Sequence, residues 1–188
     1  MRNLSDQEII DSVRKGNESD YSIIVDRYKN KAFSMLKRML KNDFDAEEVL
    51  QDCFVRAYNS LNSFKGEAKF STWFYRIVYN TALTKLSSKK RMTEAEMTSV
   101  EDHFNLESDY SPDEIEKKDL SEFIKEIVNK LPERYAAIIT MFYLNEMNIE
   151  EISEVMQLSV SNVKVMLHRS RNSLRDLILN SRLSGELI

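Results

Sequence analysis

Apolar residues recur at steps of three and four positions along most of this chain. Between residues 21 and 40, for example, Tyr28, Ala32, Met35 and Met39 follow this spacing, with polar residues between them. Such spacing places side chains on one face of an α-helix. Only three glycines and two prolines interrupt the 188 residues, so few positions break a helix. The pattern predicts an all-α fold.

Capping residues divide this pattern into separate helices. Ser5, with Glu8 three residues later, forms a capping box that starts the first helix, and Gly16 is expected to end it. Asp45, with Glu48 three residues later, is expected to cap the third helix. Further start signals predict helices at Ser71 (running to about Lys90), Pro112, Pro132, Asn148 and Ser159.

The helical pattern disappears between residues 91 and 111, where apolar residues are sparse. A segment of this composition cannot bury enough apolar surface to fold by itself. We therefore expect two small helical domains, residues 1–92 and 112–188, joined by a flexible acidic linker over residues 93–111.

The net charge of −4 hides three local charge blocks. Residues 61–92 contain seven basic residues and one acid, residues 93–130 contain twelve acids and four bases, and residues 159–188 contain five bases and two acids. Exposed charges further apart than about 10 Å act locally in physiological salt. The two basic blocks therefore favour nucleic-acid binding despite the acidic total. We also expect the acidic linker to cover these basic faces in the free protein.

The C-terminal block has the layout of a helix-turn-helix. A short helix with Ile152 and Val155 on its inner face is followed by the turn 157–159 and by a longer helix that buries Val163 and Leu167. In this motif the second helix enters the major groove, where Lys, Arg and Asn side chains bind base edges. The predicted DNA-facing residues are Ser159, Ser161, Asn162, Lys164, His168, Arg169 and Arg171.

The central basic block is an aromatic helix. Trp73, Arg76 and Asn80 fall on one face, and the loop 64–70 precedes the helix. Aromatic rings stack on unpaired bases and basic residues neutralise phosphates, so this helix suits single-stranded nucleic acid. For Trp73 a role in the core stays open. The predicted single-strand contacts are Phe64, Lys69, Trp73, Arg76, Asn80, Lys89, Lys90 and Arg91.

Several functional classes lack their residues. One cysteine excludes a disulfide framework, and the two histidines have no metal-ligand spacing with it. No glycine-rich phosphate loop and no nucleophile–base pair is found, so we expect no cofactor, no metal and no enzymatic activity. The N-terminus has no signal-peptide pattern and no apolar run approaches a membrane span, which predicts a cytoplasmic protein.

Three motifs in order resemble those of extracytoplasmic-function (ECF) sigma factors of the sigma-70 family. Residues 45–52 resemble the segment that docks on RNA polymerase, residues 64–91 the segment that reads and melts the downstream promoter element, and residues 131–134 the start of the region that reads the upstream element. The resemblance covers nearly the whole chain. It implies a sigma factor with two domains, sigma region 2 and sigma region 4, that binds core polymerase and directs transcription initiation.

The resemblance also implies particular partners and roles. Core polymerase would be bound through the clamp of its largest subunit and the flap of its second-largest subunit, the clamp by Asp45, Glu48, Gln51 and Asp52. Promoter DNA and an anti-sigma factor are the other implied partners. The family commonly has Gly-Thr-Val-Lys-Ser-Arg-Leu at positions 161–167, where this chain has Ser-Asn-Val-Lys-Val-Met-Leu. That departure leaves the upstream sequence preference open.

Two alternatives remain at this point. A stand-alone helix-turn-helix regulator would account for the C-terminal block but would give the aromatic helix no function. An adaptor that binds only protein partners would make both basic stripes incidental.

Overall fold

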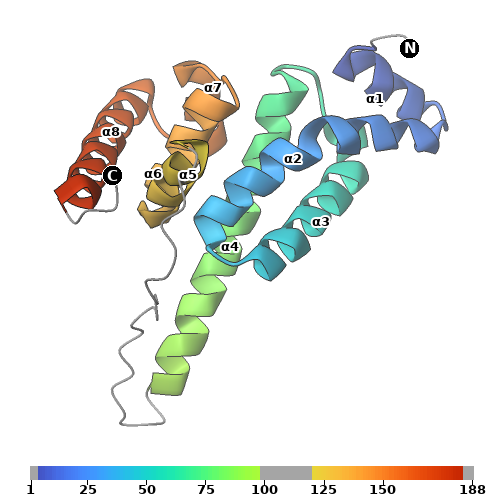
Figure 1. Cartoon of the computed structure of the whole chain (residues 1–188). Helices are drawn as coiled ribbons and strands as arrows, with labels where there is room; N and C mark the ends of the chain where they lie inside the picture. Colours follow the sequence, from blue (N-terminus) through green and yellow to red (C-terminus); the bar gives the residue numbers. More distant parts are fainter. Residues whose placement is uncertain (1–3, 98–119, 184–188) are drawn as a thin grey trace.

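The computed structural model describes residues 4–97 and 120–183, and within them every regular element is helical (Figure 1). The N-terminal half contains α1 (Asp6–Arg14), η1 (Glu18–Asp20), α2 (Tyr21–Leu40), α3 (Asp43–Asn59), η2 (Leu61–Ser63) and α4 (Phe70–Met97). The C-terminal half contains α5 (Leu120–Lys130), α6 (Glu133–Ile139), the π-helical turn η3 (Thr140–Leu144), α7 (Ile149–Met156) and α8 (Val160–Leu183). The all-α prediction is confirmed.

The N-terminal half is a bundle in which α2, α3 and α4 pack against each other. Its centre is aromatic: Phe74 is fully buried, and its ring stacks on Phe54 with centroids 4.9 Å apart and lies 5.5 Å from Tyr28. Aromatic pairs at these separations add to the free energy gained by burial. The three helices therefore meet at one ring cluster.

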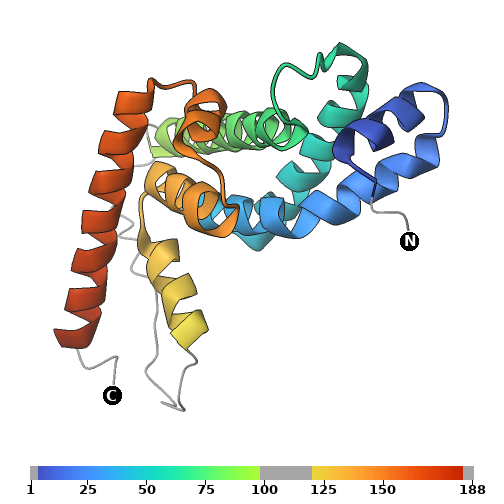
Figure 2. The ribbon, with the colours of Figure 1, turned by 90° about the horizontal axis from the view of Figure 1, so that it is seen from above.

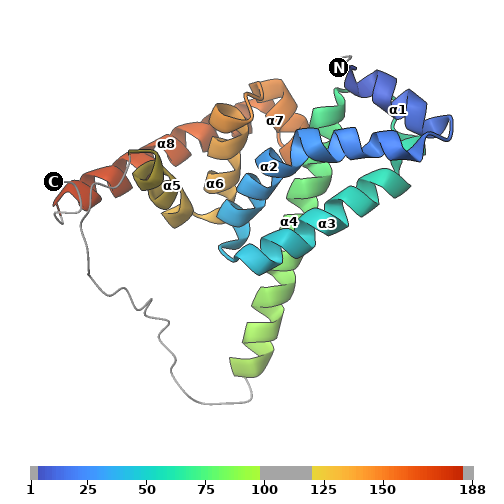
Figure 3. The same cartoon turned by 45° about the vertical axis from the view of Figure 1, so that its right-hand side comes forward.

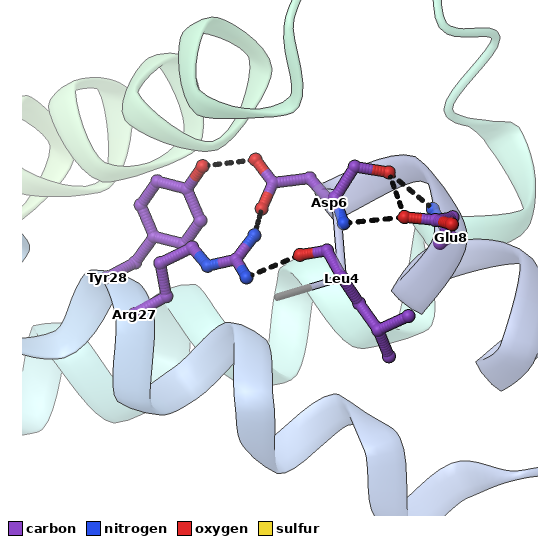
Figure 4. A network of polar contacts seen from close by, with 6 residues as sticks. Leu4, Asp6, Glu8, Arg27 and Tyr28 are labelled. Atoms are coloured by element: carbon purple, nitrogen blue, oxygen red, sulfur yellow. Dashed lines mark hydrogen bonds and ion pairs between the residues drawn. The ribbon is translucent and has the colours of Figure 1, made fainter. Parts of the chain in front are cut away.

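A polar network attaches α1 to α2 (Figure 4). Asp6 accepts hydrogen bonds from the Tyr28 hydroxyl and the Arg27 guanidinium, and Arg27 Nη2 also donates to the carbonyl of Leu4 at 2.7 Å. Burial and the bond to Asp6 raise the pKa of Tyr28, so this hydroxyl stays a donor at neutral pH. The predicted capping box is present beside it, where the amide of Ser5 donates to Glu8 at 2.8 Å.

The third helix begins earlier than predicted. Asn42 is its N-cap, and the Asn42 side chain accepts a hydrogen bond from the amide of Asp45 at 3.0 Å. The expected cap at Asp45 is therefore wrong. Asn is as good an N-cap as Asp, and at Asn42 it leaves the Asp45 carboxylate available for lysines on α4.

The fourth helix is longer than predicted, because α4 continues to Met97 rather than ending near Lys90. The first residues of the predicted linker, 93–97, are thus helical. The rest of that linker and the predicted helix start at Pro112 lie outside the described residues. The starts after Pro132, Asn148 and Ser159 are confirmed.

The two halves pack against each other. α7 lies against α4 and α6 against α2, as both Figure 2 and Figure 3 show. A second buried stripe on α4, made by Thr72, Tyr75 and Tyr79, runs beside the aromatic core. Burial raises the pKa of Tyr79, and Arg134 at the start of α6 lies close enough to oppose this rise. Tyr79 thus lies close to the C-terminal half, whereas the ring of Tyr75 packs edge-on against Tyr28 of α2, with centroids 6.4 Å apart.

Replacing Phe74 by alanine should destabilise the protein by about 3–5 kcal/mol, because the substitution leaves a cavity in the ring cluster. Urea unfolding followed by circular dichroism measures this change. Phe44→Ala is the matched control, because Phe44 is 85% exposed and its loss should change the unfolding free energy by less than about 0.5 kcal/mol. Equal effects of the two substitutions would contradict this description of the core.

Candidate nucleic-acid interfaces

A pocket of about 510 Å³ opens between the loop before α4 and the first turns of that helix. Gly66 has φ +73°, a left-handed conformation that side chains rarely adopt, and it lets the loop turn beside α4. The pocket has a polar and aromatic lining, formed by Ser63, Phe64, Lys65, Gly66, Glu67, Ala68, Thr72, Trp73, Arg76 and Glu154. Its size and lining suit one extruded base.

Trp73 packs on the core and is also partly exposed at the pocket. Its ring packs against Phe64 and Phe70 at centroid distances of 5.2 and 5.5 Å, yet it is half-buried and borders the pocket. Phe64 was predicted to meet DNA, but it is only 6% exposed. The structure therefore makes Phe64 chiefly a support for Trp73, because the loop folds back onto α4.

The remaining predicted residues of the central helix lie at the surface. Arg76 and Asn80 are exposed on successive turns of α4, and Arg76 borders the pocket. Lys90 and Arg91 are exposed further along the same helix. The structure thus gathers Trp73 and Arg76 at one pocket and spreads the basic residues along α4 beyond it.

The predicted polymerase-binding residues divide into two groups. Gln51 and Asp52 are exposed on α3. Asp45 and Glu48 instead pair with α4, where Lys85 Nζ lies 2.6 Å from Glu48 Oε2 and 3.4 Å from Asp45 Oδ1, and Lys89 also binds Asp45. The bond from Lys89 lowers the pKa of Asp45, with Lys85 adding to the effect against partial burial. Asp45 therefore joins α3 to α4.

The helix-turn-helix has the predicted parts. Gln157 ends α7 with φ +55°, and the hydroxyl of Ser153 donates to the carbonyl of Leu158 at 2.6 Å, which holds the turn. Ser159 Oγ accepts from the amide of Asn162 at 3.3 Å and lies 3.0 Å from Ser161 Oγ. Exposed residues form one outward stripe on α8: Ser161, Asn162, Lys164, Val165, His168 and Arg169.

Arg171 is also exposed, but it has a partner that the sequence did not reveal. Its Nε donates to the Tyr143 hydroxyl at 2.8 Å, and its guanidinium lies 5.4 Å from the Phe142 ring centroid. Tyr143 is itself half-exposed on η3. Because η3 precedes Arg171 by about thirty residues, local spacing carries no signal for this contact. The stacking fixes the orientation of the guanidinium at the surface.

Acidic residues of α7 reach the pocket. Glu151 Oε1 lies 2.7 Å from Lys69 Nζ, and Glu154 lines the pocket from the opposite half of the molecule. Burial raises the pKa of Glu151, but the hydrogen bonds from Lys69 and from the backbone of Asn148 outweigh burial and lower it. From the sequence, Glu151 is recognisable only as part of a helix cap. Its pairing with Lys69 depends on how the two halves pack.

Other candidate chemistry is limited. Cys53 is buried, and burial raises the pKa of its thiol to about 11, which keeps it protonated and unreactive. Over residues 4–97 and 120–183, no group of three potential ligands is arranged to hold a metal. The helices in those ranges include none with the length and apolar character that crossing a bilayer requires.

Both halves match one protein family. Residues 24–92 match Sigma-70 region 2, and residues 123–174 match Sigma-70, region 4. The ECF RNA polymerase sigma factor SigW of Bacillus subtilis (strain 168) is 35% identical over 173 residues, which cover 88% of this chain and 92% of SigW. This chain belongs to the ECF sigma factors of the sigma-70 family.

Two solved structures share the fold of this sigma factor. CnrH, in complex with the cytosolic domain of CnrY, is 21% identical, with a TM-score of 0.65 over 92% of this chain and 96% of CnrH. The sigma factor RpoE from Bartonella quintana, in complex with the anti-sigma factor NepR, is 18% identical, with a TM-score of 0.64 over 85% of this chain and 96% of RpoE. At these identities the likeness concerns the fold alone.

The sigma factor directs promoter recognition and transcription initiation, and its role is not enzymatic. A stand-alone regulator would need only region 4, whereas this chain matches region 2 as well. The aromatic helix α4 thus belongs to the part of the family fold that a simple regulator lacks.

The ion pairs of Asp45 make a prediction for acid stability. A carboxylate whose pKa is lowered in the folded state stabilises the fold above about pH 4, and this stabilisation is lost as the pH falls through the lowered pKa. The unfolding free energy of the wild type should therefore fall more steeply below about pH 4 than that of Asp45→Asn. Urea unfolding at a series of pH values measures both curves. Asp26→Asn is the control, because Asp26 is an exposed residue of α2. Parallel curves for wild type and Asp45→Asn would show that Lys85 and Lys89 do not hold this carboxylate.

Proposed function

We propose that the sigma factor divides promoter recognition between its two halves. The pocket beside Trp73 and the exposed face of α4 with Arg76 and Asn80 bind the separated strand of the downstream element. The exposed stripe of α8 binds the paired upstream element in the major groove. The observation that carries this proposal is the pocket of about 510 Å³, which has an indole on one side and cations at its rim.

The chemistry of the two surfaces supports this division. Stacking one base on an aromatic ring contributes about 1–3 kcal/mol, which offsets part of the cost of extruding the base. On α8, Asn162, Lys164 and Arg169 are exposed along one stripe, and these residue types donate to adenine or guanine edges. Three polar residues on the same surface suit phosphate contacts: Ser159, Ser161 and Arg171. His168 bonds to Asn172 at 3.2 Å on this surface.

Core polymerase is the partner proposed for α3. Glu48, Gln51 and Asp52 share one exposed edge of this helix, and we assign them to the clamp of the largest polymerase subunit. Asp45 contributes to this surface indirectly, because its bonds to Lys85 and Lys89 hold the N-terminal end of α3 against α4. The flap of the second-largest subunit is assigned to region 4.

An anti-sigma factor is the proposed regulator. CnrH and RpoE of Bartonella quintana, whose folds resemble this one, are each seen in a complex, in the second case with an anti-sigma factor. A partner that binds both halves would compete with polymerase for them.

Separating two steps of initiation tests the division of labour. Holoenzyme is assembled from core polymerase and each variant, on a promoter located by mapping transcript starts after overexpression. Lys164→Ala and Arg169→Ala should weaken promoter binding by about 1–3 kcal/mol in a mobility-shift assay. Arg76→Ala and Asn80→Ala should bind the duplex but lose permanganate reactivity of unpaired thymines, which reports strand opening.

A double variant, Gln51→Ala with Asp52→Ala, should fail one step earlier, at assembly with core polymerase in size-exclusion chromatography. Asp26→Ala on α2 carries the same charge change as Asp52→Ala and should assemble normally. Permanganate reactivity that survives in both α4 variants would overturn the assignment of the pocket and α4. If Lys164→Ala loses the same binding free energy on promoter DNA and on scrambled DNA, Lys164 contacts a phosphate and does not read a base.

A further inference from the structure

One aliphatic side chain stands among the polar residues that face outward on α8. Val165 is 49% exposed, while its neighbours on this stripe are Lys164, His168 and Arg169. It also borders a hollow of about 210 Å³, which is lined by Tyr135, Leu158, Asn162, Val165, Met166 and Arg169. The stripe is thus not uniformly polar. Val165 lies between Asn162 and Arg169, whose side chains can donate hydrogen bonds.

The major groove offers one apolar group at the base edges, the 5-methyl group of thymine. Asn162, Val165 and Arg169 are spaced i, i+3 and i+7, which spans about 10 Å along a helix. That distance matches about three base pairs at 3.4 Å each. A methyl-bearing base can therefore face Val165 while Asn162 and Arg169 donate to its neighbours.

We propose that Val165 selects a thymine in the upstream element through its 5-methyl group, between the positions that Asn162 and Arg169 read. This inference rests on the proposed placement of α8 in the major groove. It assigns a preference for thymine to position 165, where this chain has Val and the family commonly has Ser. Cytosine offers no methyl group there and is rejected.

Deoxyuridine scanning tests this assignment. Each thymine of the upstream element is replaced singly by deoxyuridine, which removes only the methyl group, and holoenzyme binding is measured by competition. One replacement should weaken binding of the wild type about three- to fivefold, which corresponds to one buried methyl group. Val165→Ser, which removes both methyl groups of the side chain, should bind the thymine and deoxyuridine promoters equally. Restoring a methyl group with 5-methylcytosine, paired with guanine, should recover part of the loss from cytosine.

Lys164→Ala is the comparison variant, because it should weaken binding to both DNAs and keep the deoxyuridine penalty. A wild type without a penalty at any position, or a penalty that persists in Val165→Ser, overturns the assignment. If base-pair changes anywhere in the upstream element leave holoenzyme binding unchanged, the placement of α8 itself is wrong. The two failures are therefore distinguishable.

A separate observation concerns the pocket beside Trp73. Glu151 and Glu154 lie one helical turn apart on α7. Glu154 forms part of the pocket lining, and Glu151 pairs with Lys69, the residue after Ala68 of the lining. The pairing raises the pKa of Lys69, which reflects a carboxylate beside its ammonium group. Carboxylates here take the place that the phosphates of a bound strand would need.

The contact between α4 and α7 also suits separation. The ion pair between Lys69 and Glu151 links the two halves, and the Lys69 side chain is 73% exposed. An exposed ion pair stabilises a contact only weakly, so it adds little to the cost of separating the halves. Because Glu154 of α7 forms part of the pocket lining, α7 leaves less room for a strand while the two halves are packed together.

We infer that α7 closes the single-strand pocket in the free sigma factor and that its two carboxylates act as a substitute for the nucleic-acid strand. Core polymerase, by binding both halves, holds them apart and opens the pocket. This inference rests on the proposed role of the pocket and adds its regulation. In this inference α7 blocks the pocket, in addition to any covering of the basic faces by the acidic linker.

The test uses the free full-length chain and a labelled single strand of the downstream element. Glu151→Gln combined with Glu154→Gln should bind the strand at least tenfold more tightly than wild type in fluorescence anisotropy. Glutamine keeps the capping box at Glu151, because its side chain also accepts from the N-cap amide. Glu150→Gln, which removes one carboxylate at an exposed position of α7, is the control and should have much less than half of this effect.

Unchanged binding by the double variant, or an equal gain from Glu150→Gln, overturns the closure. Adding Arg76→Ala to the double variant should abolish the gain, which links it to the pocket. If the wild-type holoenzyme also fails to bind the strand, the fault lies with the proposed role of the pocket and not with its closure by α7.

Discussion

Helix α4 is buried on two sides, because α2 and α3 pack against one side and α7 against the other. The ring of Phe74 fixes the first contact, and the Lys69–Glu151 ion pair lies at the N-terminal end of α4, between the two halves. What remains exposed is a narrow face with Arg76 and Asn80, beside the half-buried Trp73. Every proposed contact with a separated strand depends on this narrow face, so the packing of α4 sets the geometry of strand capture.

The two packing contacts differ in character. The contact with α2 and α3 is aromatic and aliphatic, which suits a permanent core. The contact with the C-terminal half includes the Lys69–Glu151 ion pair. Exposed ion pairs contribute at most about 1 kcal/mol, and here the Lys69 side chain is 73% exposed. The N-terminal bundle is therefore built to persist, while its contact with the C-terminal half is suited to exchange with other partners.

The charges of α3 and α4 show how one surface serves both folding and binding. Asp45 and Glu48 bind lysines of α4, whereas Gln51 and Asp52, less than two turns further along α3, face the solvent. The edge that we assign to polymerase thus overlaps these ion pairs at Glu48. On α8, Arg171 is held by Tyr143 and Phe142, which orients its guanidinium for the phosphate contact that we propose. Ordering a side chain in advance reduces the entropy lost on binding.

Helical spacing and capping residues in the sequence were sufficient to predict the all-α fold, the capping box at Ser5, the helix start at Asn148 and the exposed stripe of α8. Each of these depends on residues within two or three turns, whose positions a helix determines. The sequence missed the cap at Asn42 because two capping residues compete there, and the choice depends on lysines of α4. The partners of Lys69 and Arg171, and the burial of Phe64, depended on the tertiary structure alone. Periodicity records which face of a helix is apolar, but the helix that covers this face, and the charges that meet at its edge, follow from packing between segments far apart in the chain.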